Sequence, residues 1–162
     1  MIFEDLSIKI SDPFKELLKE TSTINKFIDY DEFKNIRLIG SGSFGSTYQA
    51  VIETFNIDVV ALKSVENIDV ITVKEILNEV NLYKDFIHDN IIKFYGITKN
   101  EGHQYLLVQE YADGGTITTY LQNNFYKLNW EHKLNLAQQL INGIKFMHEK
   151  EIIHGNLVIK KF

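Results

Sequence analysis

The chain has 162 residues and a formal net charge of −5 at neutral pH, and hydrophobic residues make up 44 % of it. A chain of this length and apolar content can bury its own core, which excludes disorder as its main state. The negative charge argues against nucleic acid or an anionic membrane surface as the main partner. Because the sequence contains no cysteine, a disulfide framework, a thiolate zinc site and a cysteine nucleophile are excluded.

The sequence has no run of the roughly 18 apolar residues that a membrane helix needs. Its first residues, Met1–Asp5, lack the basic start of a signal peptide. We therefore expect a cytoplasmic protein with no membrane partner.

Residues 1–32 are expected to form a leader that precedes the domain. Asp12 can cap a short helix that has Pro13 in its first turn, and an apolar stripe follows at Phe14, Leu17 and Leu18. Such a helix lies against the domain, frays in solvent or docks on a partner, and the pattern leaves these alternatives open.

From Phe33 onward, β-branched and aromatic residues alternate with polar ones, which is typical of strands. We expect strands over Phe33–Ile39, Ser46–Thr54, Asp58–Ser64, Ile91–Ile97 and Gln104–Glu110, with a polar turn at Lys99–Gly102 joining the last two. Between the third and fourth strands, Thr72 and Glu75 have the spacing of a capping box and begin an amphipathic helix that runs to Lys84. Helices are then expected over Ile117–Gln122 and Trp130–His148.

The run Gly40–Gly45 has the spacing G-x-G-x-x-G, which both dinucleotide-binding folds and kinase folds use. In a dinucleotide fold the third glycine begins a helix. Here the residues after Gly45 alternate as a strand, and Lys63 follows on the next strand within Val60–Lys63. This arrangement resembles the phosphate-covering loop and lysine strand of protein kinases.

The resemblance to the protein kinase superfamily, in its tyrosine-kinase-like or serine/threonine branch, covers residues 33–162. It implies an α+β fold, with a five-stranded antiparallel N-lobe sheet and one helix over residues 33–112. The first helices of the C-lobe would follow over residues 113–162. The resemblance also implies an ATP-binding cleft. The positions that it assigns to the nucleotide are Ile39, Gly40, Ser41, Gly42, Ser43, Phe44, Gly45, Thr47, Ala61, Lys63, Gln109, Glu110 and Ala112.

Roles within the cleft are carried over from the family. Lys63 would contact the α- and β-phosphates and be held by Glu79, since Glu75 is taken as the capping residue. Gln109 would be the gatekeeper, while Glu110 and Ala112 would present backbone groups to the adenine. The simpler interpretations are a plain glycine hairpin and a lysine that extends into solvent.

The resemblance fails at the catalytic positions. His154–Leu157 aligns with the family's catalytic loop, and Asn156 stands where the family has the aspartate that acts as general base. Gly155 replaces the loop arginine, and Lys161 stands at a metal-binding asparagine position. No Asp-Phe-Gly occurs in the sequence. We expect weak ATP binding with little Mg²⁺ dependence, no protein-held metal, and no phosphoryl transfer.

Two alternatives to this pseudokinase-like interpretation stay open, namely an active kinase acting on protein Ser, Thr or Tyr, and a non-functional gene fragment. The long helix carries a further expectation, because later kinase helices would cover its apolar face and the sequence does not contain them. We expect self-association, a covering protein partner or local unfolding beyond about Gly115. The face consists of Leu134, Ala137, Leu140, Ile141, Ile144 and Met147.

Overall fold

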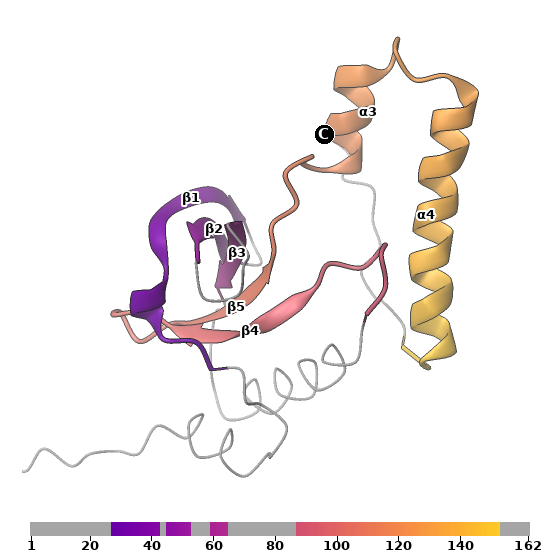
Figure 1. Cartoon of the computed structure of the whole chain (residues 1–162). Coiled ribbons are helices and arrows are strands. Elements are labelled where there is room, and N and C mark those ends of the chain that lie inside the picture. Colours follow the sequence, from indigo (N-terminus) through magenta and orange to yellow (C-terminus); the bar gives the residue numbers. More distant parts are fainter. Residues whose placement is uncertain (1–26, 43–44, 53–58, 65–86, 153–162) are drawn as a thin grey trace, which may run out of the picture.

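The computed structural model describes residues 27–42, 45–52, 59–64 and 87–152. These residues form a five-stranded sheet followed by two helices (Figure 1). The elements are η1 (Tyr30–Glu32), β1 (Lys34–Gly42), β2 (Gly45–Val51), β3 (Val59–Ser64), β4 (Phe94–Lys99), β5 (Tyr105–Glu110), α3 (Ile117–Asn124) and α4 (Trp130–Glu149).

The sheet has the strand order β1-β2-β3-β5-β4, and every neighbouring pair of strands is antiparallel. This confirms the predicted α+β class with a five-stranded antiparallel sheet. The predicted turn between β4 and β5 is also present, because Asn100 closes it with its backbone and side chain, accepting the Gln104 amide at 2.8 Å through Oδ1. The predicted helices over 12–18 and 72–84 lie outside the described residues.

The fourth strand begins at Phe94, and its predicted start at Ile91 is wrong. The amide of Ile91 is used in a turn, where it donates to the His88 carbonyl at 3.0 Å. The Lys93 amide donates to the Glu110 carboxylate at 3.1 Å instead of to a backbone carbonyl. Since these two amides have other partners, regular pairing with β5 starts only at Phe94.

The first strand is longer than predicted and continues through the glycine-rich run to Gly42. Gly40, Ser41 and Gly42 pair with Thr47, Ser46 and Gly45, respectively. The β1–β2 hairpin therefore includes the first two glycines in its strands, and its whole first strand is exposed.

The core lies on one face of the sheet, and the segment that precedes β1 helps to close it. Ile28 is 3 % exposed, and its amide donates to the Ile97 carbonyl at 2.9 Å. Residues 27–32, which the sequence placed in the leader, thus pack with the sheet. The buried cluster consists of Ile28, Phe33, Ala50, Ile52, Val60, Leu62, Leu106 and Val108.

The two helices begin at polar caps that the sequence supplies. The Thr116 hydroxyl accepts the Thr119 amide at 3.1 Å, and Asn129 Oδ1 accepts the His132 amide at 2.8 Å. Both helices end within two residues of the predicted ends. No helix among the described residues is long and apolar enough to cross a membrane.

Candidate functional site: a nucleotide cleft

The strand register places the predicted nucleotide-binding side chains on the face of the sheet opposite the core. Thr47 on β2 lies opposite Lys63 on β3, which in turn lies opposite Leu107 on β5. Two residues along each strand, Ala61 lies opposite Gln109. Residues that lie opposite each other share a face, as do residues two apart, whereas the core residues alternate with them. The structure therefore brings Thr47, Ala61, Lys63 and Gln109 together.

The glycines of the glycine-rich run differ in backbone conformation. Gly45 has φ of 102°, a conformation that L side chains rarely adopt, so the turn back into β2 requires glycine there. Gly40 and Gly42 have no such conformation, and a Cβ built at either residue would meet no atom of the described part of the chain within 4 Å. Neither backbone strain nor a neighbouring atom explains why these two residues lack a side chain. The space beside them is open to an outside group.

The base of this hairpin is fixed by a hydrogen bond that the sequence did not indicate. The Ser46 amide donates to the Ser64 hydroxyl at 2.6 Å, and Ser64 is 2 % exposed. Ser64 directly follows Lys63, but a serine at a buried strand position has no pattern that distinguishes it from a packing residue. Ile39, predicted to contact the nucleotide, lies at a register irregularity between Leu38 and Gly40 and is 44 % exposed.

The segment that leaves β5 contains the residues that the resemblance assigns to the hinge. The Glu110 amide donates to the Lys93 carbonyl at 2.9 Å, while the Glu110 carboxylate accepts the Lys93 amide. In a regular antiparallel pair, the Lys93 amide would donate to the Glu110 backbone carbonyl. Here the Glu110 side-chain carboxylate accepts that hydrogen bond instead. Burial, with a smaller contribution from the Glu110 charge, raises the pKa of Tyr95 above its ordinary value.

An open cavity of about 530 Å³ lies beside this segment. Its walls come from residues Glu110–Thr116 after β5, the turn at Asp89–Ile92 and the helices α3 and α4. The cavity shares Glu110 and Ala112 with the predicted nucleotide positions. Lys63 and Ala61 are not part of its wall, so it borders the predicted cleft without being the cleft itself.

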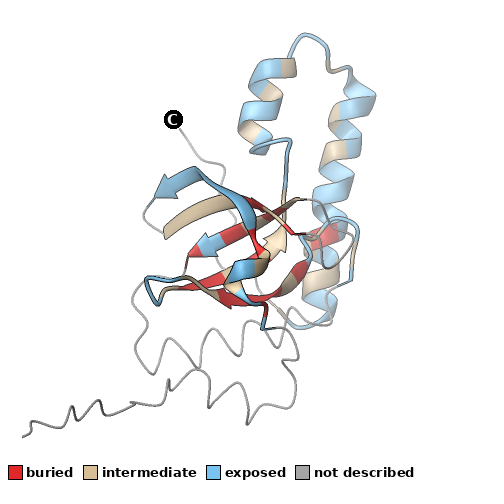
Figure 2. Cartoon of the chain, turned by 60° about the vertical axis from the view of Figure 1, so that its left-hand side comes forward, coloured by how far each residue is buried: buried red, intermediate tan, exposed pale blue. Residues whose placement is uncertain are grey.

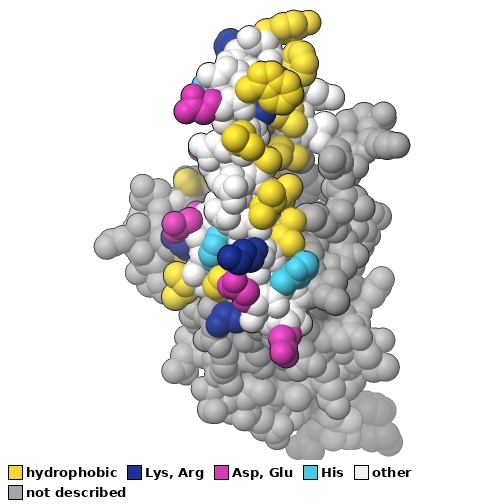
Figure 3. Space-filling view, turned by 90° about the vertical axis from the view of Figure 1, so that its right-hand side faces the viewer, with side chains coloured by type: hydrophobic (Ala, Val, Ile, Leu, Met, Phe, Trp, Pro, Cys, Tyr) yellow, Lys and Arg dark blue, Asp and Glu magenta, His cyan; other side chains and the backbone are white. Residues whose placement is uncertain are grey.

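The helical pair presents a band of hydrophobic side chains (Figure 3). Leu134 is 70 % exposed, and Leu140 and Ile141 are about half exposed. Ile144 and Met147 on the same predicted face are half-buried. On a neighbouring face of this end of α4, Gly143 packs against Asn90. There the His88 and Phe146 rings lie 4.8 Å apart. Self-association or a covering partner stays a prediction.

Several predicted site residues lie outside the described residues. They are Ser43, Phe44, Glu79 and Asn156. The Lys63–Glu79 pair and the catalytic-loop positions therefore remain predictions. Within the described ranges, no group of three or more His, Cys, Asp or Glu side chains could hold a metal ion.

Comparison with known proteins decides the family. The family model described as protein tyrosine and serine/threonine kinase matches residues 33–161. The chain belongs to this kinase family. The match begins at the start of the sheet and includes α3 and α4, so the sheet and both helices lie within the kinase domain.

Kinases of varied organisms resemble the chain. A probable serine/threonine-protein kinase of Dictyostelium discoideum is 32 % identical over 83 % of this chain and 15 % of its own length. A leaf rust 10 disease-resistance locus receptor-like protein kinase-like protein of Arabidopsis thaliana is 32 % identical over 75 % of the chain and 18 % of its own length. Mitogen-activated protein kinase kinase kinase 1a of Physcomitrium patens is 27 % identical over 92 % of the chain and 20 % of its own length. The chain thus spans a fifth or less of these relatives.

Proposed function

We propose that this kinase-domain chain binds an adenine nucleotide between the β1–β3 face and the hinge, and that it does not itself transfer the phosphoryl group. The adenine would lie against Ala61 and the hinge backbone, and the phosphates would lie beside Gly40, Gly42 and Lys63. The single observation that carries the proposal is the open space beside the two glycines, on the face that also presents Lys63.

The chemistry of these groups suits a polyphosphate. Strand amides without neighbouring side chains can approach anionic oxygens closely, and glycine removes the Cβ that would block them. Lys63 adds a positive charge from an exposed position in the adjacent strand. In kinases Mg²⁺ neutralises charge on the phosphates when bound. Lys161 stands at a position where the family has a metal-binding asparagine, so we propose weak binding with little dependence on Mg²⁺.

The proposed lack of transfer rests on the sequence of the catalytic loop. The amide of Asn156 cannot accept a proton from a substrate hydroxyl as the family's aspartate does. Loss of a general base costs about 10²- to 10⁴-fold in rate. Lys161 would place a cation where the family binds metal, so Asn156→Asp alone is not expected to restore transfer.

Calorimetric titration of the 162-residue chain with ATP, with and without Mg²⁺, tests binding. Gly40→Ala and Gly42→Ala should leave the midpoint of unfolding unchanged, because the added methyl meets no atom. Each should weaken ATP binding by about tenfold or more, since the methyl occupies the space proposed for phosphate. The matched control is Gly102→Ala in the β4–β5 turn, where a Cβ meets Asn100 Oδ1 at an ordinary 3.4 Å. Equal ATP affinity in all three variants would overturn the proposed placement.

The names of the relatives favour one alternative, in which the chain phosphorylates Ser or Thr of proteins. The assay is incorporation of labelled phosphate into a generic acceptor protein. Incorporation above background that disappears in Lys63→Ala would establish the alternative. Our proposal predicts background incorporation in the wild type and in Asn156→Asp.

A further inference from the structure

The β1–β2 hairpin extends beyond the strand that supports it. The last ladder pair between β2 and β3 is Thr47 with Lys63, whereas β1 and β2 continue to pair as far as Gly42 with Gly45. The segment that carries Gly40 and Gly42 is therefore a two-stranded ribbon, and β3 pairs only with the base of this ribbon. An isolated two-stranded ribbon is at best marginally stable in water.

Ser64 meets this ribbon at the point where support ends. Ser46 and Ser64 occupy the next register position after Thr47 and Lys63, but the strands are joined there by a side chain. The Ser64 hydroxyl accepts the Ser46 amide at 2.6 Å, and its residue is 2 % exposed. The bond therefore extends β2–β3 pairing by one step, on the side of the sheet away from the nucleotide face.

The other polar contact at this base is weaker. The hydroxyls of Ser41 and Ser46 lie 3.3 Å apart and are exposed to solvent. Water competes for exposed hydroxyls, whereas a buried hydroxyl has no such competitor. Of these two contacts, the Ser64 bond therefore holds the base of the ribbon more strongly.

The geometry points to Ser64 as a positioning residue for the phosphate-binding ribbon, acting through the Ser46 amide and never touching the nucleotide. The inference rests on the proposed function, because it assigns Ser64 the task of holding Gly40 and Gly42 over the phosphates. Loss of the hydroxyl lets the ribbon swing about Ser46. The adenosine part of the ligand, which lies against Ala61 and the hinge, is not affected.

The test compares Ser64→Ala with Ser64→Thr, which keeps a hydroxyl on the same carbon. The matched control is Thr98→Val, which removes a fully buried hydroxyl of β4 that has no hydrogen-bond partner among the described residues. Amide exchange of Ser46 is measured first, in the absence of nucleotide. Ser64→Ala should speed it by about three- to tenfold, while Ser64→Thr and Thr98→Val leave it near the wild-type rate.

Affinities for ATP and adenosine are then measured on the same proteins. Ser64→Ala should weaken ATP binding by about three- to tenfold and leave adenosine binding unchanged, with recovery in Ser64→Thr. Equal weakening of both ligands, or unchanged Ser46 exchange, would overturn the inference. If the wild type binds neither ligand, the proposed function fails and the positioning role fails with it, while the exchange result still reports whether Ser64 holds the ribbon.

Discussion

The sheet and the helical pair of this chain are built on different principles. The sheet closes a core in which Leu62, Ile52 and Val108 have no exposed surface, whereas in the helices only Gly143 is buried among the described residues. Burial is concentrated in the strands and exposure in α3 and α4 (Figure 2). The comparison indicates that the sheet has a buried core of its own and that, among the described residues, the helices are held by a few local contacts.

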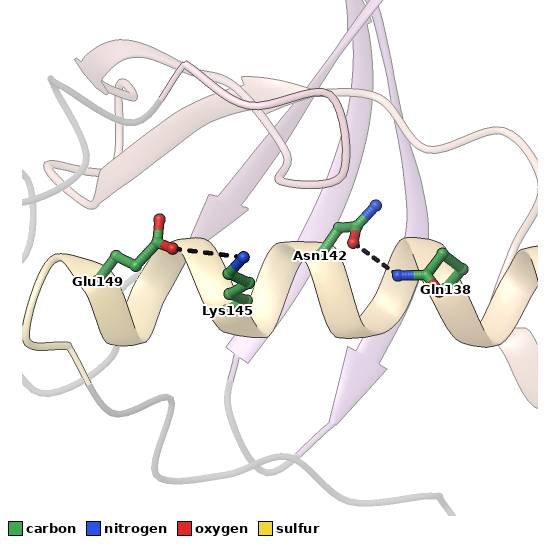
Figure 4. Close-up of polar contacts among 4 residues, drawn as sticks. All are labelled: Gln138, Asn142, Lys145 and Glu149. Carbon is green, nitrogen blue, oxygen red and sulfur yellow. Dashed lines mark hydrogen bonds and ion pairs between the residues drawn. The ribbon is translucent and has the colours of Figure 1, made fainter.

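Those local contacts are visible along α4. Gln138 Nε2 donates to Asn142 Oδ1 at 2.9 Å, and Lys145 Nζ lies 3.7 Å from Glu149 Oε1 (Figure 4). Each pair spans one helical turn. Exposed pairs of this kind contribute about 0.3–0.5 kcal/mol each. They cannot replace a buried core, so α4 should open at lower free energy than the sheet.

The largest expected effect separates the two regions by a matched leucine truncation. Leu62→Ala leaves a cavity in the sheet core and should cost about 2–5 kcal/mol of unfolding free energy. Leu134→Ala removes a side chain that is 70 % exposed and should cost about 0.5 kcal/mol or less. Chemical denaturation of both variants gives the two values. Equal costs would show that α4 has a core of its own.

A second substitution tests the contact between α4 and the turn that precedes β4. A Cβ on Gly143 would lie 3.1 Å from the Asn90 carbonyl oxygen, so Gly143→Leu should push α4 away from the 88–91 turn at a cost of about 1–3 kcal/mol. Lys145→Leu, on the same helix, breaks an exposed ion pair and serves as the control. Amide exchange should rise along α4 in Gly143→Leu and stay unchanged in β2 and β3. Loss of protection in the sheet would mean that the two regions unfold together.

A smaller effect is expected at the start of α4. Asn129→Ala removes the cap that accepts the His132 amide and should cost about 1 kcal/mol, confined to the helix. Circular dichroism of the helical signal, compared with Asn129→Asp, which keeps an acceptor, measures the loss. An equal loss in both variants would argue against the cap.

The smallest effect is in alkaline solution. The pKa of Tyr95 is raised above its ordinary 10.0 by burial and then by Glu110, so the folded state holds the phenol proton more tightly than the unfolded state. This contribution to stability is complete below about pH 10 and is lost as pH rises through the folded-state pKa. Tyr95→Phe should flatten the fall in melting temperature above pH 10. The control is Tyr126→Phe, which changes a fully exposed residue in the turn between α3 and α4 and should leave this fall unchanged. An unchanged slope in Tyr95→Phe would contradict the assignment.

The sequence predicted the parts of the fold that depend on local patterns. Alternation placed the strands, and an apolar face at helical spacing placed α4. The start of β4 could not be predicted, because it depends on the Glu110 carboxylate taking the amide of Lys93, far away in sequence. Ile28 was missed for a related reason, since its burial depends on a non-local bond to Ile97.

Some features of the candidate site follow from local sequence, and others depend on residues that are distant in the sequence. The requirement for glycine at Gly45 follows from its turn, and the opposition of Thr47 and Lys63 follows from strand register. The hydrogen bond of Ser64 to the Ser46 amide was not predicted, because it depends on where the pairing of β2 with β3 ends. The burial of Gly143 was likewise not predicted, since it depends on the distant residue Asn90 packing against α4.

Amide exchange along the chain, with and without saturating ATP, tests the central claim most directly. The account predicts added protection at Gly40–Thr47, around Lys63 and at the hinge, with exchange in α4 unchanged and faster than in β3. No added protection at the glycine-rich run, or protection that appears only in α3 and α4, would contradict it.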